Sequence, residues 1–134
     1  MVERQGIPLV IRHTAANVNE TTMLETMVDA IPAIRQKRGR PRKRPHKLHA
    51  DKGYDSIKNR KFLRRRRIIP RIARRRIDSS EKLGRHRWVV ERTLSWLNRF
   101  RRLKVRYERR ADIHQAFLTL GCAMVCWNFI DRFC

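Results

Sequence analysis

Positive charge is the feature that most constrains how this chain can fold. The 134 residues include 34 Lys and Arg but only 12 Asp and Glu, so the formal net charge at pH 7 is +22. A compact state with this charge repels itself unless a polyanion or salt offsets the repulsion. The basic residues are spread over several segments rather than along one helix face, which favours a nucleic acid over a membrane surface. We therefore expect a nucleic-acid partner and no membrane partner.

The remaining composition is typical of one domain. Hydrophobic residues make up 41% of the sequence, enough for one core, so we predict a single domain over 1–134. Cys122, Cys126 and Cys134 form no Cys-x-x-Cys pair and are expected to be small core residues in a reducing compartment. We expect no signal peptide, and the apolar stretch 116–130 is too short and too interrupted to span a bilayer. The expected location is the cytoplasm.

Alternating strand and helix patterns predict an α/β fold. Short runs of branched apolar residues predict strands over 9–14, 48–51 and 68–72. Capping residues followed by apolar residues at helical steps predict helices over 19–31 and 56–67. Helix patterning dominates the rest of the chain.

Helical spacing also selects the expected core. The first helix is expected to bury Met23, Met27 and Ala30. Steps of four and three residues then connect Trp96, Phe100, Leu103 and Tyr107, and later Ile113, Phe117, Leu120, Met124 and Trp127. Asp112 and Gln115 have the spacing of a capping box for the last helix. We expect the aromatic residues to anchor the core rather than to stack on bases.

A basic loop is expected over 35–47, where eight of thirteen residues are Lys or Arg. Its Arg38-Gly39-Arg40-Pro41 segment resembles the AT-hook core. The glycine permits close approach, the proline keeps the chain extended, and arginines enter a narrow, negative A·T minor groove. The alternative is a solvated loop that binds any phosphate. The candidate DNA-binding residues of the loop are Arg38, Arg40, Arg42, Lys43 and Arg44.

Two further basic runs flank the strand expected over 68–72. They either line a DNA channel or form solvated helix ends, where cations favour the C-terminus of a helix. The runs are Arg64, Arg65, Arg66 and Arg67, and then Arg74, Arg75 and Arg76. The first run joins the candidate DNA-binding residues.

Asp51 stands apart from this basic background. It follows a short strand and precedes a glycine turn, which is where open α/β sheets place ligand-binding groups. A carboxylate there can share a hard divalent cation such as Mg²⁺ with a second acid, at a phosphodiester. The alternative is that Asp51 caps the following turn.

Glu91 is the second acid of interest. It lies on a basic helix beside Trp88, Val90 and Leu94, and we expect it in an apolar rather than a solvent-facing setting. Such a setting is costly for an acid unless a metal ion needs it. The alternative is an ion pair with a neighbouring arginine, either Arg87 or Arg92.

Six motifs follow one another over nearly the whole chain. They are Ala50-Asp51-Lys52-Gly53-Tyr54-Asp55-Ser56, Ile69-Pro70, Gly84-Arg85-His86-Arg87-Trp88-Val89-Val90-Glu91-Arg92-Thr93, Trp96-Leu97, Arg101-Arg102-Leu103 and Arg106-Tyr107-Glu108. Their ordered combination resembles the C-terminal half of bacterial insertion-sequence transposases of the DDE class. The opening Gly6-Ile7-Pro8-Leu9 and Thr14-Ala15-Ala16-Asn17 is similar to the strand pair that precedes this half in the family.

The resemblance implies an RNase H-like fold and a reaction. That reaction is Mg²⁺- or Mn²⁺-dependent hydrolysis and strand transfer at the ends of a mobile DNA element. By resemblance, Asp51 is the second acid of the catalytic triad and Glu91 is the third, and both are metal ligands. Arg87, one helical turn before Glu91, matches a family arginine, and its fork of donors suits a phosphate contact.

Two departures from the family pattern shape the expected activity. The family's first acid lies on an upstream strand that has no counterpart here, and Glu3 is not expected to replace it. A family lysine beyond the glutamate corresponds to Asn98. We therefore predict an N-terminally truncated RNase H-like mixed sheet that needs an upstream transposase polypeptide, with homo-oligomerisation as a further expectation. The alternatives are a non-catalytic, basic DNA-binding remnant and an RNA-packing protein, although the latter leaves both acids unexplained.

Overall fold

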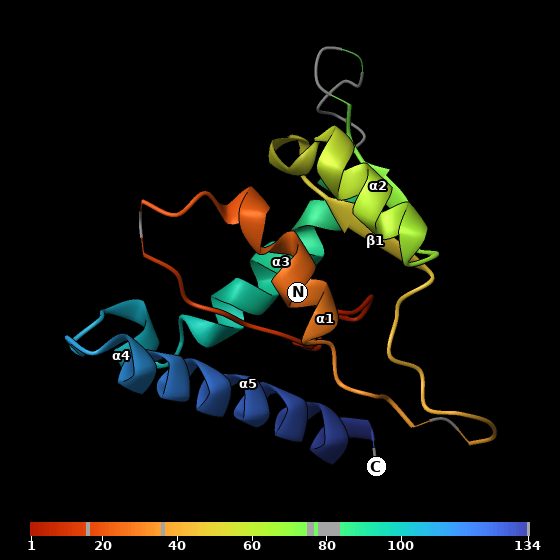
Figure 1. The fold of residues 1–134 in the computed structure, drawn as a ribbon. Helices are drawn as coiled ribbons and strands as arrows, with labels where there is room; N and C mark the ends of the chain where they lie inside the picture. Colours follow the sequence, from red (N-terminus) through yellow and green to blue (C-terminus); the bar gives the residue numbers. More distant parts are fainter. Residues whose placement is uncertain (16, 36, 75–76, 78–83, 134) are drawn as a thin grey trace. The chain divides into compact units, whose positions relative to one another are not determined.

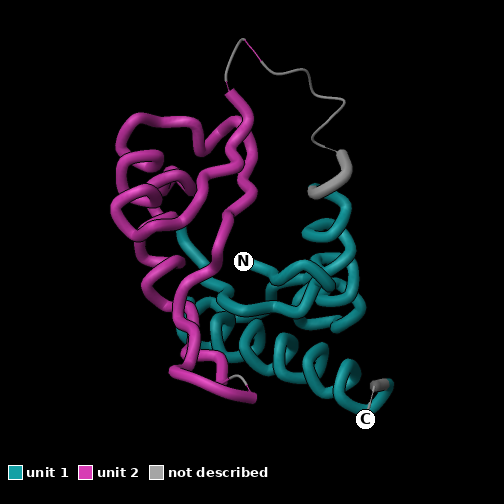
Figure 2. The backbone as a smooth tube through the Cα atoms, turned by 90° about the vertical axis from the view of Figure 1, so that its right-hand side faces the viewer, with its two compact units in different colours: residues 1–15, 87–134 teal, residues 16–86 magenta. Residues whose placement is uncertain are grey.

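The computed structural model describes residues 1–15, 17–35, 37–74, 77 and 84–133 and divides into two compact units. Unit 1 comprises Met1–Ala15 and Arg87–Cys134, and unit 2 comprises Ala16–His86 (Figure 2). Each unit has its own buried residues. The single domain predicted over the whole chain stays a prediction, because a division by contacts does not decide whether the units fold independently.

Unit 2 contains a strand–helix–strand element. Its strands β1 (Lys47–Ala50) and β2 (Ile69–Ile72) pair in parallel, with Lys47 opposite Ile69. Parallel strands need a long crossover, and α2 (Ile57–Arg65), which contacts β2, supplies it (Figure 1). These two predicted strands and the helix between them are confirmed to within two residues at each end.

Local hydrogen bonds determine where α2 begins and ends. The Ser56 hydroxyl caps the helix by accepting from the Asn59 N–H at 3.1 Å. At the other end, Arg67 has a φ of 55°, in the left-handed region. Its N–H bonds the carbonyl three residues before it, and the Ile68 N–H bonds the Leu63 carbonyl, both at 2.8 Å. This pair of bonds stops a helix at a position where glycine is the usual residue.

The helix predicted over 19–31 is present but shorter. A 3-10 turn, Glu20–Met23, leads into α1 (Leu24–Asp29), and the Asn19 side chain caps the turn by accepting from the Thr21 N–H at 3.0 Å. The predicted buried stripe is wrong. Leu24, Val28 and Ile31 are buried, whereas Met23, Met27 and Ala30 are only half-buried. Both sets keep steps of four and three, so spacing could not separate them, and the chain buries the set with three large branched side chains.

The core of unit 2 gathers apolar side chains from α1, α2, both strands and the residues next to them. Its members are Leu24, Val28, Ile31, Leu48, Phe62, Leu63, Ile68, Ile72 and Ala73. The buried Asn59 amide is compensated by donating to the Tyr54 carbonyl at 3.1 Å. The α/β class is therefore confirmed, with a two-stranded sheet among the described residues. The larger RNase H-like mixed sheet stays a prediction.

Unit 1 is helical, with α3 (Gly84–Leu97), α4 (Arg101–Lys104) and α5 (Ala111–Phe133). The predicted stripe through Trp96, Phe100, Leu103 and Tyr107 does not lie on one helix. Phe100 has extended backbone between α3 and α4, and Tyr107 is exposed in the segment before α5. Gly121 of α5 permits the close approach of α4, since a Cβ there would lie 2.7 Å from the Leu103 side chain. The chain therefore folds α4 back onto α5 (Figure 1).

The strand predicted over 9–14 is wrong. These residues have no strand partner among those described, although Val2 and Pro8 form an isolated bridge. The Gln115 side chain of α5 instead accepts from the His13 N–H at 2.8 Å and donates to the Ile11 carbonyl at 3.1 Å. A helix side chain thus pairs with the backbone of the N-terminal segment in the manner of a neighbouring strand, which no local pattern predicts.

The predicted capping box of α5 is also wrong. Gln115 contacts the N-terminal segment, and Asp112 pairs with Arg110 at 2.6 Å. The helix begins at Ala111, one residue before the expected cap. Asp112 therefore lies inside the first turn, where its negative charge interacts favourably with the helix dipole.

The stripe predicted to bury α5 lies largely on its exposed side. Ile113, Leu120, Met124 and Trp127 are 41–64% exposed and Phe117 is half-buried. Among the residues of α5 whose burial the structure describes, His114, Gly121 and Val125 are buried, again at helical steps. Because α5 is apolar around most of its circumference, periodicity could not choose its buried face.

Among the described residues, α5 is the one helix long and apolar enough to cross a membrane, over Ala111–Arg132. The argument that residues 116–130 are too short therefore no longer applies, because the helix is longer than that stretch. A single such helix is weak evidence for a span, since core helices meet the same criteria. Cys122 and Cys126 on α5 are half-buried, and burial raises the pKa of both thiols, as expected of core cysteines. Cys134 lies outside the described residues.

Candidate metal centre and nucleic-acid interface

Asp51 lies where the sequence places it, directly after β1. Its Oδ1 accepts from the Lys52 N–H at 2.6 Å and caps the short 3-10 helix Lys52–Tyr54. Capping and metal binding do not exclude each other, because the cap uses only one of the two carboxylate oxygens of Asp51. Asp51 is exposed. Burial, followed by the charges of Glu20 and Asp51, raises the pKa of the Tyr54 hydroxyl. The phenol thus lies in a negative environment.

The loop after Asp51 is anchored by Arg60 of α2. Its Nε contacts Asp55 Oδ1 at 2.8 Å, and one terminal nitrogen donates to the Ile72 carbonyl at 2.9 Å. Both side chains of the ion pair are 18% exposed. Arg60 therefore joins α2, the end of β2 and the Asp51 loop. Sequence reasoning missed this role because the pair connects residues that share no helical spacing.

Glu91 is not in the predicted apolar setting. Its side chain is 61% exposed, and its Oε1 pairs with the Arg87 Nε at 2.9 Å, one turn earlier on α3. Trp88, Val90 and Leu94 are themselves 45–51% exposed, so they do not enclose the carboxylate. The local ion pair considered as an alternative is what the structure shows. The phosphate contact of Arg87 stays a prediction.

Arg92, the other arginine considered for Glu91, has a different partner set. Its guanidinium lies 4.3 Å from the ring centroid of Trp88 and 4.9 Å from that of Trp96. It also donates to the Gln5 carbonyl at 2.6 Å. The two tryptophans therefore hold an arginine that binds the N-terminal segment to α3. This contact was missed because Trp96 was expected to serve only as a core anchor and Trp88 only as an apolar neighbour of Glu91.

The convergence of the two acids stays a prediction. Asp51 belongs to unit 2 and Glu91 to unit 1, and each unit is defined by its own contacts. Among the described residues, no group of three or more His, Cys, Asp and Glu side chains lies in a metal-binding arrangement. The donor chemistry itself fits, since both carboxylates are exposed oxygen donors of the kind that Mg²⁺ and Mn²⁺ bind.

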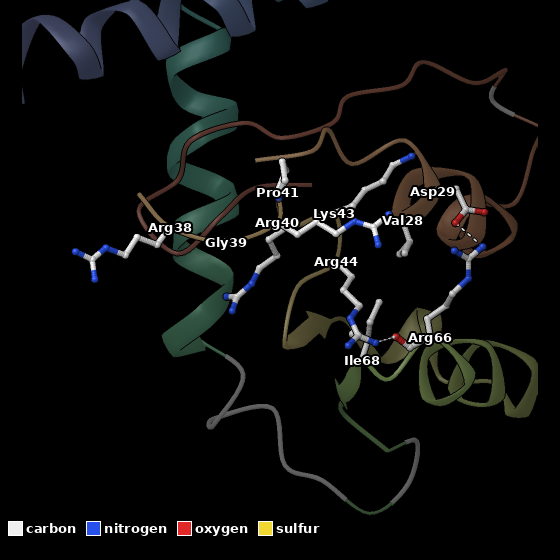
Figure 3. A pocket seen from close by; sticks show the side chains of 11 residues that line it. Val28, Asp29, Arg38, Gly39, Arg40, Pro41, Lys43, Arg44, Arg66 and Ile68 are labelled. Atoms are coloured by element: carbon white, nitrogen blue, oxygen red, sulfur yellow. Dashed lines mark hydrogen bonds and ion pairs between the residues drawn. The ribbon is translucent and has the colours of Figure 1, made fainter. Parts of the chain in front are cut away.

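Apart from Gln36, which lies outside the described residues, the basic loop is confirmed as a loop, although Lys47 already begins β1. Ile34 and Arg42 exchange both backbone hydrogen bonds at 2.8 Å, which closes the segment between them. Together with residues of α1 and of the segment that follows α2, the loop lines a hollow of about 810 Å³ (Figure 3). Lys43 and Arg44 are among its lining residues.

The first of the two other basic runs lies at the end of α2. Arg64, Arg65, Arg66 and Arg67 are all exposed. Their position agrees with both readings, a favourable helix terminus and a DNA contact. In the second run, Arg75 and Arg76 lie outside the described residues, as do the side chains of Arg85 and His86 in the long motif.

Glu108, the last residue of the family-like motifs, is a structural acid that sequence reasoning did not assign. Arg102 of α4 donates to its Oε1 at 2.7 Å, and the Glu108 side chain is 6% exposed. Its Oε2 lies 3.8 Å from the His114 Nδ1, and neither atom has a hydrogen-bond partner among the described residues. Glu108 thus connects α4 to the start of α5. The hydrogen bond from Arg102 is the main reason that the pKa of Glu108 lies below its ordinary 4.5.

Replacing Glu108 by glutamine is expected to lower the melting temperature in a pH-dependent way. A lowered pKa in the folded state stabilises the protein above pH 4.5, and that contribution is lost as pH falls through the folded value. The difference in melting temperature between the wild type and Glu108→Gln should therefore shrink below pH 4.5. Glu25→Gln, which removes an exposed ion pair with Lys58, is the control and should give only a small difference. A Glu108 difference that stays constant down to the lowest pH would contradict the assignment.

Comparison with known proteins supplies the family context. A family model described as transposase DDE domain matches residues 1–127. The chain is also 53% identical, over 132 residues, to a Burkholderia cepacia protein named as a transposase for insertion sequence element IS402. That match covers 98% of this chain and 63% of the relative, so the chain spans less than two thirds of the relative's length. No solved structure gives a significant match.

Proposed function

Because the chain belongs to the transposase DDE domain family, we propose that it provides Asp51 and Glu91 as metal ligands for DNA transposition. The reaction would be cleavage and transfer of DNA strands at the ends of an insertion sequence. The observation that carries the proposal is the position of Asp51, an exposed carboxylate directly after a parallel strand. Strand ends of this kind are where open α/β sheets place ligand-binding groups.

Mg²⁺ or Mn²⁺ is the proposed cofactor. A metal ion bound at these acids would polarise the phosphodiester and lower the pKa of the attacking water. Glu91 is available for this role because its exposed pair with Arg87 contributes only about 0–1 kcal/mol. Once Glu91 binds metal, the Arg87 guanidinium would be free to donate to a phosphate oxygen.

In the proposed assembly, the chain adopts the RNase H-like fold of the transposases, with Asp51 and Glu91 close together. The first acid of the triad comes from an upstream polypeptide, since no residue of this chain corresponds to it by resemblance. The partners are the element ends and target DNA, with a second copy of the chain to hold the other end. The proposed location is the cytoplasm. The basic residues that would position DNA are Arg38, Arg40, Arg42, Lys43, Arg44, Arg64, Arg65, Arg66 and Arg67.

The test is cleavage of element-end DNA by the chain mixed with the upstream polypeptide of its own element. The mixture is expected to cut in Mg²⁺, while the chain alone shows little or no cutting. Asp51→Asn and Glu91→Gln should each lower the rate at least about 100-fold, because each removes a metal ligand. Asp131→Asn and Glu25→Gln, which change exposed or half-exposed acids outside the proposed site, are the matched controls. Wild-type rates in either site variant, or cutting in chelator, would overturn the proposal.

The second candidate function is that of a non-catalytic DNA-binding remnant. The ion pair of Glu91 with Arg87 favours it, because that contact explains the acid without a metal ion. The net charge of +22 is common to both candidates. A remnant would bind DNA equally well in chelator and after Glu91→Gln, and it would not support cleavage with any upstream polypeptide.

A further inference from the structure

The basic loop is closed at its base and open at its tip. The paired hydrogen bonds between Ile34 and Arg42 hold its two ends together. Gly39 has a φ of +88°, and no heavy atom lies within 4 Å of the position that a Cβ would occupy. The left-handed backbone at Gly39 turns the chain, and the space in front of it is free. Arg38 and Arg40 therefore stand on either side of an unobstructed turn.

The charges of the loop fall into two groups. Arg44 donates to the Arg66 carbonyl at 3.0 Å, and Arg66 pairs with Asp29 at 2.7 Å, so these side chains hold the loop to α1 and α2. Among the described residues, no carboxylate pairs with Arg38, Arg40, Arg42 or Lys43. Figure 3 shows Arg38 and Arg40 leaving the loop on the side away from the Asp29–Arg66 pair.

The division into anchoring and unpaired cations favours a polyanion with a narrow, extended binding surface. Unpaired cations on one short segment repel one another until a polyanion neutralises them. A flat phosphate surface would be served by any set of basic side chains. A narrow A·T-rich minor groove has the strongest negative potential on duplex DNA, and arginines inserted into it are favoured. A glycine between two arginines lets the backbone approach the groove without a side chain in the way.

We infer that residues 37–43 of the basic loop are a minor-groove binding site, in which Arg38 and Arg40 enter A·T-rich DNA on either side of Gly39. Arg42 and Lys43, nearer the closed base, contact the phosphates that border the groove. Pro41 keeps the backbone extended beside Arg40 and has no N–H to leave unpaired. The inference rests on the proposed function only in taking DNA as the ligand. It requires neither the metal nor the two acids.

The test is equilibrium binding of the full chain, in chelator, to duplexes of equal length that are either A·T-rich or G·C-rich. The wild type is expected to bind the A·T-rich duplex about tenfold more tightly, an effect of the size of one specific contact. The double variant Arg38→Lys, Arg40→Lys keeps the net charge but should lose this preference, since lysine does not replace a planar guanidinium in a narrow groove. Arg99→Lys, Arg109→Lys, which changes two exposed arginines outside the proposed DNA-binding residues, is the matched control and should retain the preference.

Two further results would decide the case. A small molecule that occupies the A·T minor groove should displace the wild type, but it should have less effect on the double lysine variant. Equal affinities of the wild type for both duplexes, or equal competition by double-stranded RNA with its wide minor groove, would overturn the inference. Loss of A·T preference with intact Mg²⁺-dependent cleavage would reject the groove site alone, whereas the reverse pattern would reject only the proposed catalysis.

Discussion

Gly6→Ala is expected to lower the free energy of unfolding by about 3 kcal/mol, the largest loss that we predict for a single methyl group. Gly6 has a φ of +90°, where a residue with a Cβ costs about 1–2 kcal/mol. The added Cβ would also lie 3.0 Å from the Thr93 Oγ1 and 3.2 Å from an Arg92 nitrogen. Overpacking of this kind costs about 1–3 kcal/mol. It would displace the hydroxyl of Thr93, which donates to the Gly6 carbonyl at 2.7 Å.

The matched control for this prediction is Gly39→Ala. Gly39 has nearly the same backbone, with a φ of +88°, but nothing lies within 4 Å of its Cβ position. Its replacement therefore isolates the backbone strain, about 1–2 kcal/mol at most. Urea unfolding followed by circular dichroism measures both variants. If the two variants lost the same free energy of unfolding, the contact of Gly6 with α3 would contribute nothing beyond the backbone strain.

Arg60→Ala is expected to lower the free energy of unfolding by roughly 2–3 kcal/mol. The change removes the hydrogen bond to the Ile72 carbonyl and leaves Asp55, 18% exposed, without this cation. Arg60 connects α2, the end of β2 and the loop that carries Asp51. The loss of its contacts should therefore increase local opening of that loop. Hydrogen exchange of the Lys52 and Tyr54 amides, both bonded to Asp51, should become faster in the variant.

Arg66→Ala is the control that tests whether the burial of the Arg60–Asp55 ion pair matters. Arg66 pairs with Asp29 at 2.7 Å, but both side chains are nearly half exposed, at 48% and 49%. An exposed pair contributes only about 0–1 kcal/mol. If urea unfolding gave the same loss for Arg66→Ala and Arg60→Ala, the anchoring role of Arg60 would be wrong.

The position of Asp51 was the part of the candidate site open to prediction from sequence. The strand before it, the turn after it and the helix from Ser56 each rest on residues within a few positions of one another. The setting of Glu91 was not open to prediction in this way. Its neighbours Trp88, Val90 and Leu94 are apolar, but only the folded chain shows that they are exposed and that Arg87 is the partner.

The sequence alone therefore determined the basic character, the basic loop, the β1–α2–β2 element and the resemblance to a transposase family. These properties depend on charge, on short-range spacing and on caps. Only the tertiary structure decided which face of α5 is buried, that Gln115 takes the place of a strand partner, and which arginines serve as anchors. The physical reason is that helical periodicity allows several equivalent faces on an apolar helix. The choice among them depends on contacts between residues about 100 positions apart, such as His13 and Gln115.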